Sequence, residues 1–188
     1  MATTISRADR LVLLGQNIED NRLTDSLQPA ADSMPVSVWG NPWHNLAFGF
    51  GSGTLPKAPG TWGSLVALAF VPLWQAMPGW GYGLVVIASM LFGIWLCGKV
   101  AQDLGVHDHE GIVWDEFAGI WITFWLVPAG WYWLLLGFVV FRVLDIFKPW
   151  PISWVDRQVH GGLGIMLDDI LAGFAACGLL HLAVLWMG

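Results

Sequence analysis

Five long apolar runs occupy the last two thirds of the chain, separated by short segments rich in Gly, Pro or charge. They cover about residues 65–77, 82–98, 112–127, 132–147 and 170–186. Several are shorter than the ~20 residues that cross a ~30 Å hydrocarbon core, so we expect soft helix boundaries. The pattern predicts an all-α, polytopic membrane bundle of about five helices over residues 41–188, preceded by a polar cytoplasmic tail, residues 1–40.

Composition supports the membrane class. Hydrophobic residues make up 56% of the chain, charged residues only 12%, and there are 14 tryptophans. These values are not typical of a water-soluble domain. The net charge of −6 and the lack of a basic stripe argue against nucleic-acid binding.

The positions of the charged residues predict the topology. If the helices alternate in direction, every Lys, Arg, Asp and Glu falls on one side of the membrane or at its rim, and the turns 78–81 and 128–131 on the other side carry no charge. Positive residues collect on the cytoplasmic face, which therefore holds the charged loops and any ionic chemistry. Tryptophans form two predicted interfacial belts: Trp74, Trp80, Trp131, Trp133 and Trp186 outside, and Trp39, Trp43, Trp62, Trp114, Trp150 and Trp154 inside.

Two acidic pairs are the strongest sign of function. Asp115 and Glu116 lie inside one apolar run, and Asp168 and Asp169 open the last one. Ionised acids in a membrane segment are costly unless they face a cavity, a cation or a partner, so they indicate a functional site. For Asp168 and Asp169 the alternative is an ordinary helix N-cap.

Small residues predict that the two pairs meet. Asp115 shares a helix face with Gly119, and Asp169 shares one with Gly173. Such faces commonly pack together in membranes. Four adjacent carboxylates need a cation to offset their repulsion, and hard oxygen ligands favour Mg²⁺. We therefore predict that Asp115, Glu116, Asp168 and Asp169 bind a metal ion at the cytoplasmic rim.

Basic and hydroxyl residues lie at the same predicted rim. Arg142 and Lys148 flank Asp145, which indicates either an internal salt pair or a pair of anion-binding side chains beside a metal. The glycine-rich loop 51–64 leads into the first apolar run with Thr61 and Ser64 at its end. Backbone amides there are suited to phosphate, although a simple turn has the same composition.

The remaining polar residues give weaker signals. His107 and His109 flank Asp108, and His160 precedes the second acidic pair, so each is a candidate acid or base or part of a solvated turn. His181 is predicted to be structural, and Cys97 and Cys177 to be packed thiols. Motifs typical of cysteine, serine, haloacid-type and zincin hydrolases are missing, which leaves metal-assisted hydrolysis.

Several motifs in order resemble the bacterial phosphatidylglycerophosphatase A family: NPWHNLAFGFGSG, APGTWGS, VHDHEGIVWDEFAGIWIT and FRVLDIFKPWPISWVDRQVHGGLGIMLDDILAG, between Asn41 and Gly173. The resemblance implies a multi-pass enzyme of the inner membrane, with its active site on the cytoplasmic side. It implies Mg²⁺-dependent removal of the terminal phosphate of phosphatidylglycerophosphate.

The residues fit that activity. Asp115, Glu116, Asp169 and Asp108 are the expected catalytic residues. Arg142, Lys148, Thr61 and Ser64 are expected to bind the phosphate. Lys57 is left out, because the family is not expected to need a lysine there.

Two other classes of protein remain as alternatives. A small cation transporter or channel subunit could use carboxylates in the membrane, but it would need them near the midplane with an exit on the other side. A purely structural or assembly subunit would have little use for two unpaired acidic doublets.

Overall fold

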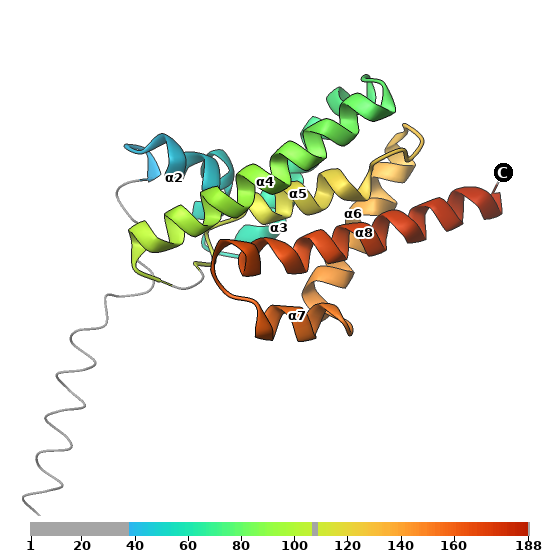
Figure 1. Ribbon diagram of the computed structural model, residues 1–188. Coiled ribbons are helices and arrows are strands. Elements are labelled where there is room, and N and C mark those ends of the chain that lie inside the picture. Colours follow the sequence, from blue (N-terminus) through green and yellow to red (C-terminus); the bar gives the residue numbers. More distant parts are fainter. Residues whose placement is uncertain (1–37, 107–108, 188) are drawn as a thin grey trace, which may run out of the picture. The chain divides into compact units, whose positions relative to one another are not determined.

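The structure is a computed structural model that describes residues 38–106 and 109–187. Most of the predicted tail, together with His107 and Asp108, therefore lies outside the described residues. The described chain is helical and contains no strand (Figure 1). The predicted all-α class is confirmed.

Each predicted apolar run contains one helix. These helices are α3 (Pro59–Gln75), α4 (Gly79–Leu104), α5 (Trp114–Thr123), α6 (Trp131–Phe147) and α8 (Gly161–Met187). Shorter elements complete the described part: α2 (Pro42–Ala47), the 3-10 helix η2 (Gly49–Thr54) and α7 (Ile152–Gln158). Helices α3 and α8 begin several residues before the apolar runs that they contain. Their first turns consist largely of glycine and polar residues, which the apolar pattern did not include.

Only two helices, α4 and α8, are long and apolar enough to cross a membrane by length and composition. The structure corrects the expectation for the 112–127 run, because α5 has only 10 residues. At ~1.5 Å per residue it is about half as long as a bilayer core is thick. By length and composition, two spans are supported in the described chain rather than five.

Helix α5 is the centre of the described bundle. It packs against α8, α4, α3 and α6, and every one of its residues except Asp115 is buried. Long helices that follow one another in the chain run in opposite directions, so the turns after α3 and α5 lie at the same end as the C-terminus (Figure 1). The beginnings of α3, α5 and α8 and the end of α6 meet at the opposite end.

Two tryptophans of the predicted belts have a different role. Trp114 is 8% exposed and stacks on Phe117 with ring centroids 5.4 Å apart. Trp74 makes an edge contact with Trp121 at 5.4 Å. The contact between Trp74 and Trp121 joins α3 to α5, whereas the stack of Trp114 on Phe117 lies within α5. Other predicted belt residues are largely exposed at the helix ends: Trp39, Trp80, Trp131, Trp150, Trp154 and Trp186.

Candidate active site

The predicted approach of the acidic helices is confirmed, and glycine makes it possible. A Cβ atom on Gly173 would lie 2.6 Å from the carbonyl oxygen of Gly119, and a Cβ on Gly119 would lie 2.9 Å from that of Asp169. Because neither residue has a side chain, α5 and α8 pack backbone against backbone. This packing brings Asp115 and Glu116 near Asp169, which is 3% exposed.

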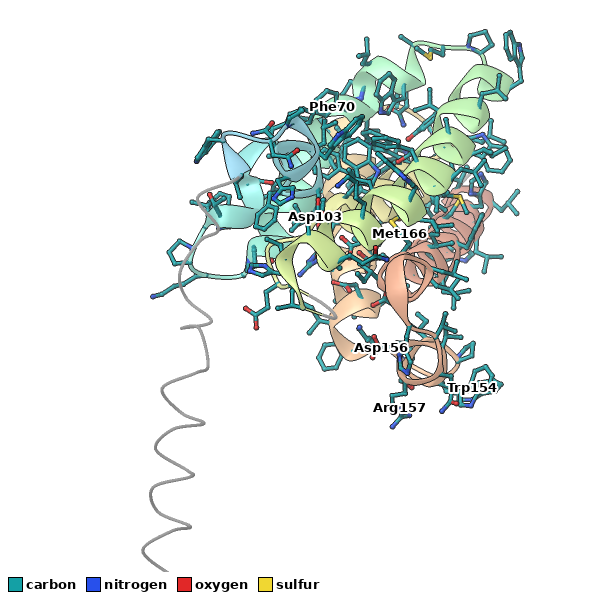
Figure 2. All side chains as sticks on the ribbon, turned by 60° about the vertical axis from the view of Figure 1, so that its left-hand side comes forward. Phe70, Asp103, Trp154, Asp156, Arg157 and Met166 are labelled. Atoms are coloured by element: carbon teal, nitrogen blue, oxygen red, sulfur yellow. The ribbon has the colours of Figure 1, made fainter. Side chains whose placement is uncertain are left out.

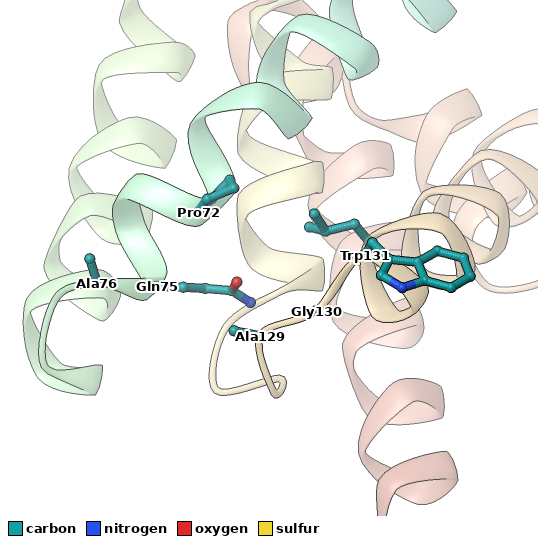
Figure 3. A pocket seen from close by; sticks show the side chains of 7 residues that line it. Pro72, Gln75, Ala76, Ala129, Gly130 and Trp131 are labelled. Carbon is teal, nitrogen blue, oxygen red and sulfur yellow. The ribbon is translucent and has the colours of Figure 1, made fainter.

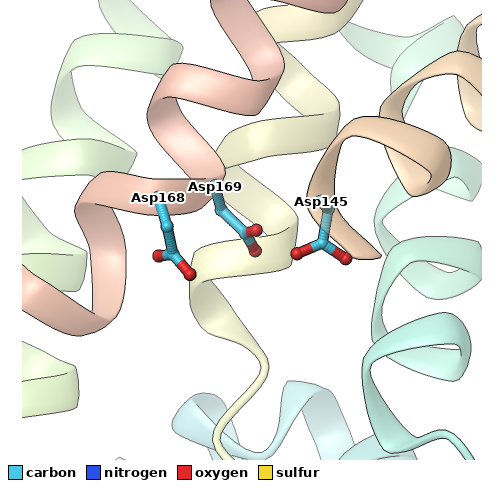
Figure 4. A group of neighbouring side chains, drawn as sticks. All are labelled: Asp145, Asp168 and Asp169. Atoms are coloured by element: carbon cyan, nitrogen blue, oxygen red, sulfur yellow. The ribbon is translucent and has the colours of Figure 1, made fainter. Parts of the chain in front are cut away.

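Three aspartates form a carboxylate cluster. One oxygen from each of Asp145, Asp168 and Asp169 lies within 4.8 Å of the other two (Figure 4). Asp145 comes from α6, and the other two come from the third turn of α8. Nearby, Asp115 adds its negative charge to the repulsion on Asp169. Such a group needs a cation or a proton to offset that repulsion.

The cluster is suited to a divalent cation, because one of its buried carboxylate oxygens lacks a hydrogen-bond partner among the described residues. Asp168 Oδ1 is buried and has no hydrogen-bond partner among the described residues. A buried acceptor without a donor is costly, and a hard cation would satisfy it. The sequence predicted Asp168 and Asp169 as metal ligands but not Asp145. Because Arg142 and Lys148 flank Asp145 in the sequence, an internal salt pair was considered for it.

Glu116 was predicted to be a metal ligand, but in the structure its carboxylate pairs with the guanidinium of Arg142. Arg142 Nη1 donates to its two carboxylate oxygens at 2.5 and 2.6 Å, and Ser64 Oγ donates to one of them at 2.5 Å. Glu116 is 7% exposed. The three-aspartate cluster therefore does not include it.

Arg142 links this buried pair to the cluster. Its Nη1 also contacts Asp145 Oδ2 at 2.7 Å, so the salt pair considered from the sequence is present. Its Nη2 donates to Thr61 Oγ1 at 3.3 Å, and Nη1 lies 3.3 Å from Ser64 Oγ. Thr61 and Ser64 thus reach the site from the first turns of α3, and they hold Arg142.

Lys148 contacts the cluster through Asp168, whereas Arg142 contacts it through Asp145. It ends α6 with a left-handed φ of 42°, and its Nζ donates to Asp168 Oδ2 at 2.6 Å and to Asp156 Oδ1 at 2.7 Å. Burial alone would lower the pKa of Lys148, but the hydrogen bonds to the two carboxylates raise it above its ordinary value. Asp156 belongs to α7, whose Trp154 and Arg157 point away from the bundle (Figure 2). No pattern in the sequence indicated a role for Asp156.

The glycine-rich loop has a packing explanation. A Cβ on Gly53 would lie 2.0 Å from the carbonyl oxygen of Gly111, and one on Gly63 would lie 2.7 Å from Val113. Gly51 has a φ of 93°, which favours glycine. These positions let η2 and α3 approach the segment before α5. Of the two interpretations left open, the structural one accounts for these glycines.

The carboxylate cluster contains no histidine among the described residues. His109 Nδ1 accepts a hydrogen bond from the Gly111 amide at 3.0 Å, and His181 bonds the Cys177 carbonyl within α8 at 2.8 Å. His44, which no sequence pattern singled out, is buried and its Nε2 lies 3.2 Å from Asp103 Oδ2. Asp103 also pairs with Lys99, so this group joins α2 to α4. His160 precedes α8, and Asp108 stays a prediction outside the described residues.

A pocket of about 350 Å³ lies at the opposite end of the bundle (Figure 3). It is formed by the end of α3 and the beginning of α6, and its lining contains no ionisable side chain: Pro72, Gln75, Ala76, Ala129, Gly130, Trp131 and Leu134. Phosphate chemistry requires charged groups. We therefore assign the candidate active site to the carboxylate cluster and not to this pocket.

Comparison with known proteins identifies the family of the chain. The family model described as phosphatidylglycerophosphatase A matches residues 45–184. A phosphatidylglycerophosphatase A of Escherichia coli is 55% identical over 75% of this chain and 83% of its own length. One of Haemophilus influenzae is 44% identical over 78% and 91%. A putative phosphatidylinositol-3-phosphatase of Bacteroides thetaiotaomicron is 37% identical over 68% and 84%. No solved structure matches.

Proposed function

Since the chain belongs to the phosphatidylglycerophosphatase A family of lipid phosphatases, we propose that it hydrolyses the terminal phosphate of phosphatidylglycerophosphate. The products are phosphatidylglycerol and inorganic phosphate. The observation that carries the proposal is the group of three aspartates between Arg142 and Lys148. Carboxylates that can hold a cation, beside two cationic side chains, suit a phosphate monoester.

We assign a bound Mg²⁺ to the cluster of Asp145, Asp168 and Asp169. Carboxylate oxygens are the ligands that Mg²⁺ prefers, and the unpaired Asp168 Oδ1 supports the fit. A bound Mg²⁺ would supply charge that polarises the phosphoryl oxygens. This set revises the ligands expected from the sequence: Asp145 enters it and Glu116 leaves it. Asp115 stays beside it as a neighbouring negative charge.

Arg142 and Lys148 are the proposed phosphate-binding residues. The buried Arg142 Nε–H has no acceptor among the described residues, so a phosphate oxygen would satisfy it. The Lys148 ammonium has three N–H donors and uses two of them on Asp156 and Asp168. The third is available to the substrate. Thr61 and Ser64 then support Arg142 instead of contacting the phosphate themselves.

The reaction needs two proton transfers. The attacking water gives up a proton to a base as it adds to phosphorus. The bond between phosphorus and the glycerol oxygen breaks, and that oxygen takes up a proton from an acid. We assign these transfers to Asp115 and Asp108. Asp115 is half-buried in the first turn of α5 beside the cluster. Asp108 is assigned from its sequence position alone.

We further propose that the protein is a multi-pass protein of the bacterial inner membrane with this site on the cytoplasmic side. The two candidate spans, α4 and α8, support this proposal. So does a row of exposed apolar side chains along α6: Leu135, Val139, Val143 and Ile146. The charged groups gather at one end, where a phospholipid presents its phosphate. A cation transporter is not favoured, because the far-end turns carry no charge.

Phosphate release from lipid vesicles tests the substrate. Purified full-length protein with Mg²⁺ is given vesicles containing either phosphatidylglycerophosphate or phosphatidylinositol 3-phosphate, the substrate named for the Bacteroides relative. We expect rapid release from the first lipid and at least about tenfold slower release from the second. An Asp169→Asn variant controls for contaminating phosphatases. Faster release from phosphatidylinositol 3-phosphate would contradict the proposed substrate.

A further inference from the structure

Glu116 and Arg142 form a buried ion pair that the mechanism above does not explain. The side chains are only 9% and 14% exposed, respectively. A buried ion pair contributes little net stability, because loss of hydration offsets much of the attraction. Stability alone therefore gives no strong reason for this pair inside the bundle.

Both oxygens of the Glu116 carboxylate are engaged. Oε1 accepts from Arg142 Nη1, and Oε2 accepts from Arg142 Nη1 and from Ser64 Oγ. A carboxylate with both oxygens committed to donors of the chain is a poorer cation ligand than Asp168, whose Oδ1 has no hydrogen-bond donor within residues 38–106 and 109–187. The geometry thus separates the function of Glu116 from that of the three aspartates.

Gly60 provides the space for this pair. It lies in the first turn of α3, and a Cβ atom there would fall 2.0 Å from Glu116 Oε1 and 3.4 Å from Arg142 Nη1. Because glycine is one of the weakest helix formers, its place in a helical turn needs a reason. The close approach of Glu116 supplies that reason.

The pair also fixes the direction of the guanidinium. Glu116 and Asp145 hold Nη1, and Thr61 holds Nη2. The five donors of a guanidinium lie in one rigid plane. Because hydrogen bonds hold both Nη1 and Nη2 of Arg142, the direction of its Nε–H bond is set as well. That N–H is the buried donor without an acceptor.

We propose that Glu116 is a positioning residue. Through the space left by Gly60, it orients the Arg142 guanidinium so that Nε–H meets a phosphate oxygen of the substrate, and it does not ligate the cation. This inference rests on the proposed function. It predicts that phosphate recognition depends on Glu116 and Gly60, whereas cation binding depends on Asp169.

The test measures phosphate recognition and cation binding separately in the purified full-length protein. Glu116→Gln removes the charge at nearly constant shape, and Gly60→Ala displaces Glu116 without altering it. In both variants we expect KM for phosphatidylglycerophosphate to rise at least about tenfold, because charge-assisted hydrogen bonds to Arg142 are lost or misdirected. Affinity for Mn²⁺, measured by electron paramagnetic resonance, should change less than about fivefold.

Two further variants complete the experiment. Asp169→Asn should reduce Mn²⁺ affinity by at least about a hundredfold. Gly178→Ala places a methyl group in open space on α8 and should match the wild type in KM and in Mn²⁺ affinity. Circular dichroism and a melting curve confirm that each variant is folded before it is compared.

The proposal is overturned if Glu116→Gln loses Mn²⁺ affinity as severely as Asp169→Asn, since Glu116 would then be a ligand. It is also overturned if folded Gly60→Ala keeps the wild-type KM. Failure of the proposed function gives a different result, because the wild type itself would then not release phosphate from this lipid.

Discussion

At the scale of single residues, the site depends on how each buried carboxylate is neutralised. Glu116 is neutralised by Arg142, and Asp168 is neutralised in part by Lys148. Asp169 lies among carboxylates that repel it and is 3% exposed. A buried negative charge of this kind requires a counter-charge. Arg142 and Lys148 supply two positive charges for the four carboxylates of Glu116, Asp145, Asp168 and Asp169, so we expect a cation at the three-aspartate cluster to supply the remaining charge.

Asp145 provides a test of the revised ligand set. Asp145→Asn keeps the shape of the side chain but removes a charged oxygen from the cluster, so cation binding should weaken. We expect kcat/KM for phosphate release at fixed Mg²⁺ to fall at least about a hundredfold. A higher Mg²⁺ concentration should recover part of the loss. Wild-type activity in this variant would remove Asp145 from the site.

Lys148 gives a prediction about pH. Hydrogen bonds raise its pKa in the folded protein above its ordinary value of 10.5, so it stays cationic from about pH 6 to 9. Lys148→Met should therefore raise KM by a similar factor throughout that range. The charge of Lys148 also stabilises the folded protein. This contribution is fully present below the pKa of Lys148 in the unfolded chain, and it is lost only as pH rises through its higher pKa in the folded protein. A KM ratio that approaches one by about pH 9 would contradict this.

The sequence predicted part of this site and missed another part for a physical reason. Asp168 and Asp169 were predicted because acids in an apolar run are costly. Asp145 was missed because its neighbours Arg142 and Lys148 offered a local partner, and no spacing rule shows that the end of α6 meets the start of α8. Glu116 was assigned with Asp115 because the two are adjacent, although successive helix residues point in different directions.

At the scale of helices, glycine decides which elements meet. The sequence located the five apolar helices and the contact between α5 and α8, because periodic small residues indicate close packing. It did not give the length of α5, since aromatic and aliphatic residues continue past Thr123 while the helix ends there. The chain then turns through Leu126, which has a left-handed φ of 61°.

The contact between α5 and α8 can be tested at Gly173. Gly173→Ala places a methyl group 2.6 Å from the Gly119 carbonyl, so the helices must separate. We expect a destabilisation of about 1–3 kcal/mol and reduced activity. Thermal unfolding in detergent measures the first effect. Gly178→Ala, with nothing within 4 Å, is the matched control. Equal melting temperatures for the two variants would argue against the close contact.

At the scale of the whole molecule, the charged groups of the described chain are separated from its apolar faces. Exposed apolar side chains follow α4 as well as α6, including Leu84, Ile87 and Leu91. Large exposed apolar surfaces are unusual on soluble proteins and typical of contact with lipid. In the proposed orientation, the site at one end would meet a lipid headgroup without taking the substrate out of the bilayer.

Orientation in the membrane can be measured by cysteine labelling in intact cells. Trp131 is 78% exposed at the uncharged end, and Arg157 is exposed at the end that holds the cluster. Trp131→Cys should react with a membrane-impermeant maleimide from outside. Arg157→Cys should react only after permeabilisation. The native Cys97 and Cys177 are buried, and the wild type serves as the background. The opposite labelling pattern would reverse the proposed topology.

The central claim is that Asp145, Asp168 and Asp169 hold a divalent cation without which the lipid phosphate is not hydrolysed. The most direct measurement is phosphate release from phosphatidylglycerophosphate vesicles by purified protein, first stripped of divalent ions with EDTA and then titrated with Mg²⁺. The account predicts that stripping reduces the rate at least about a hundredfold and that Mg²⁺ restores it. An undiminished rate in the stripped protein would contradict the account.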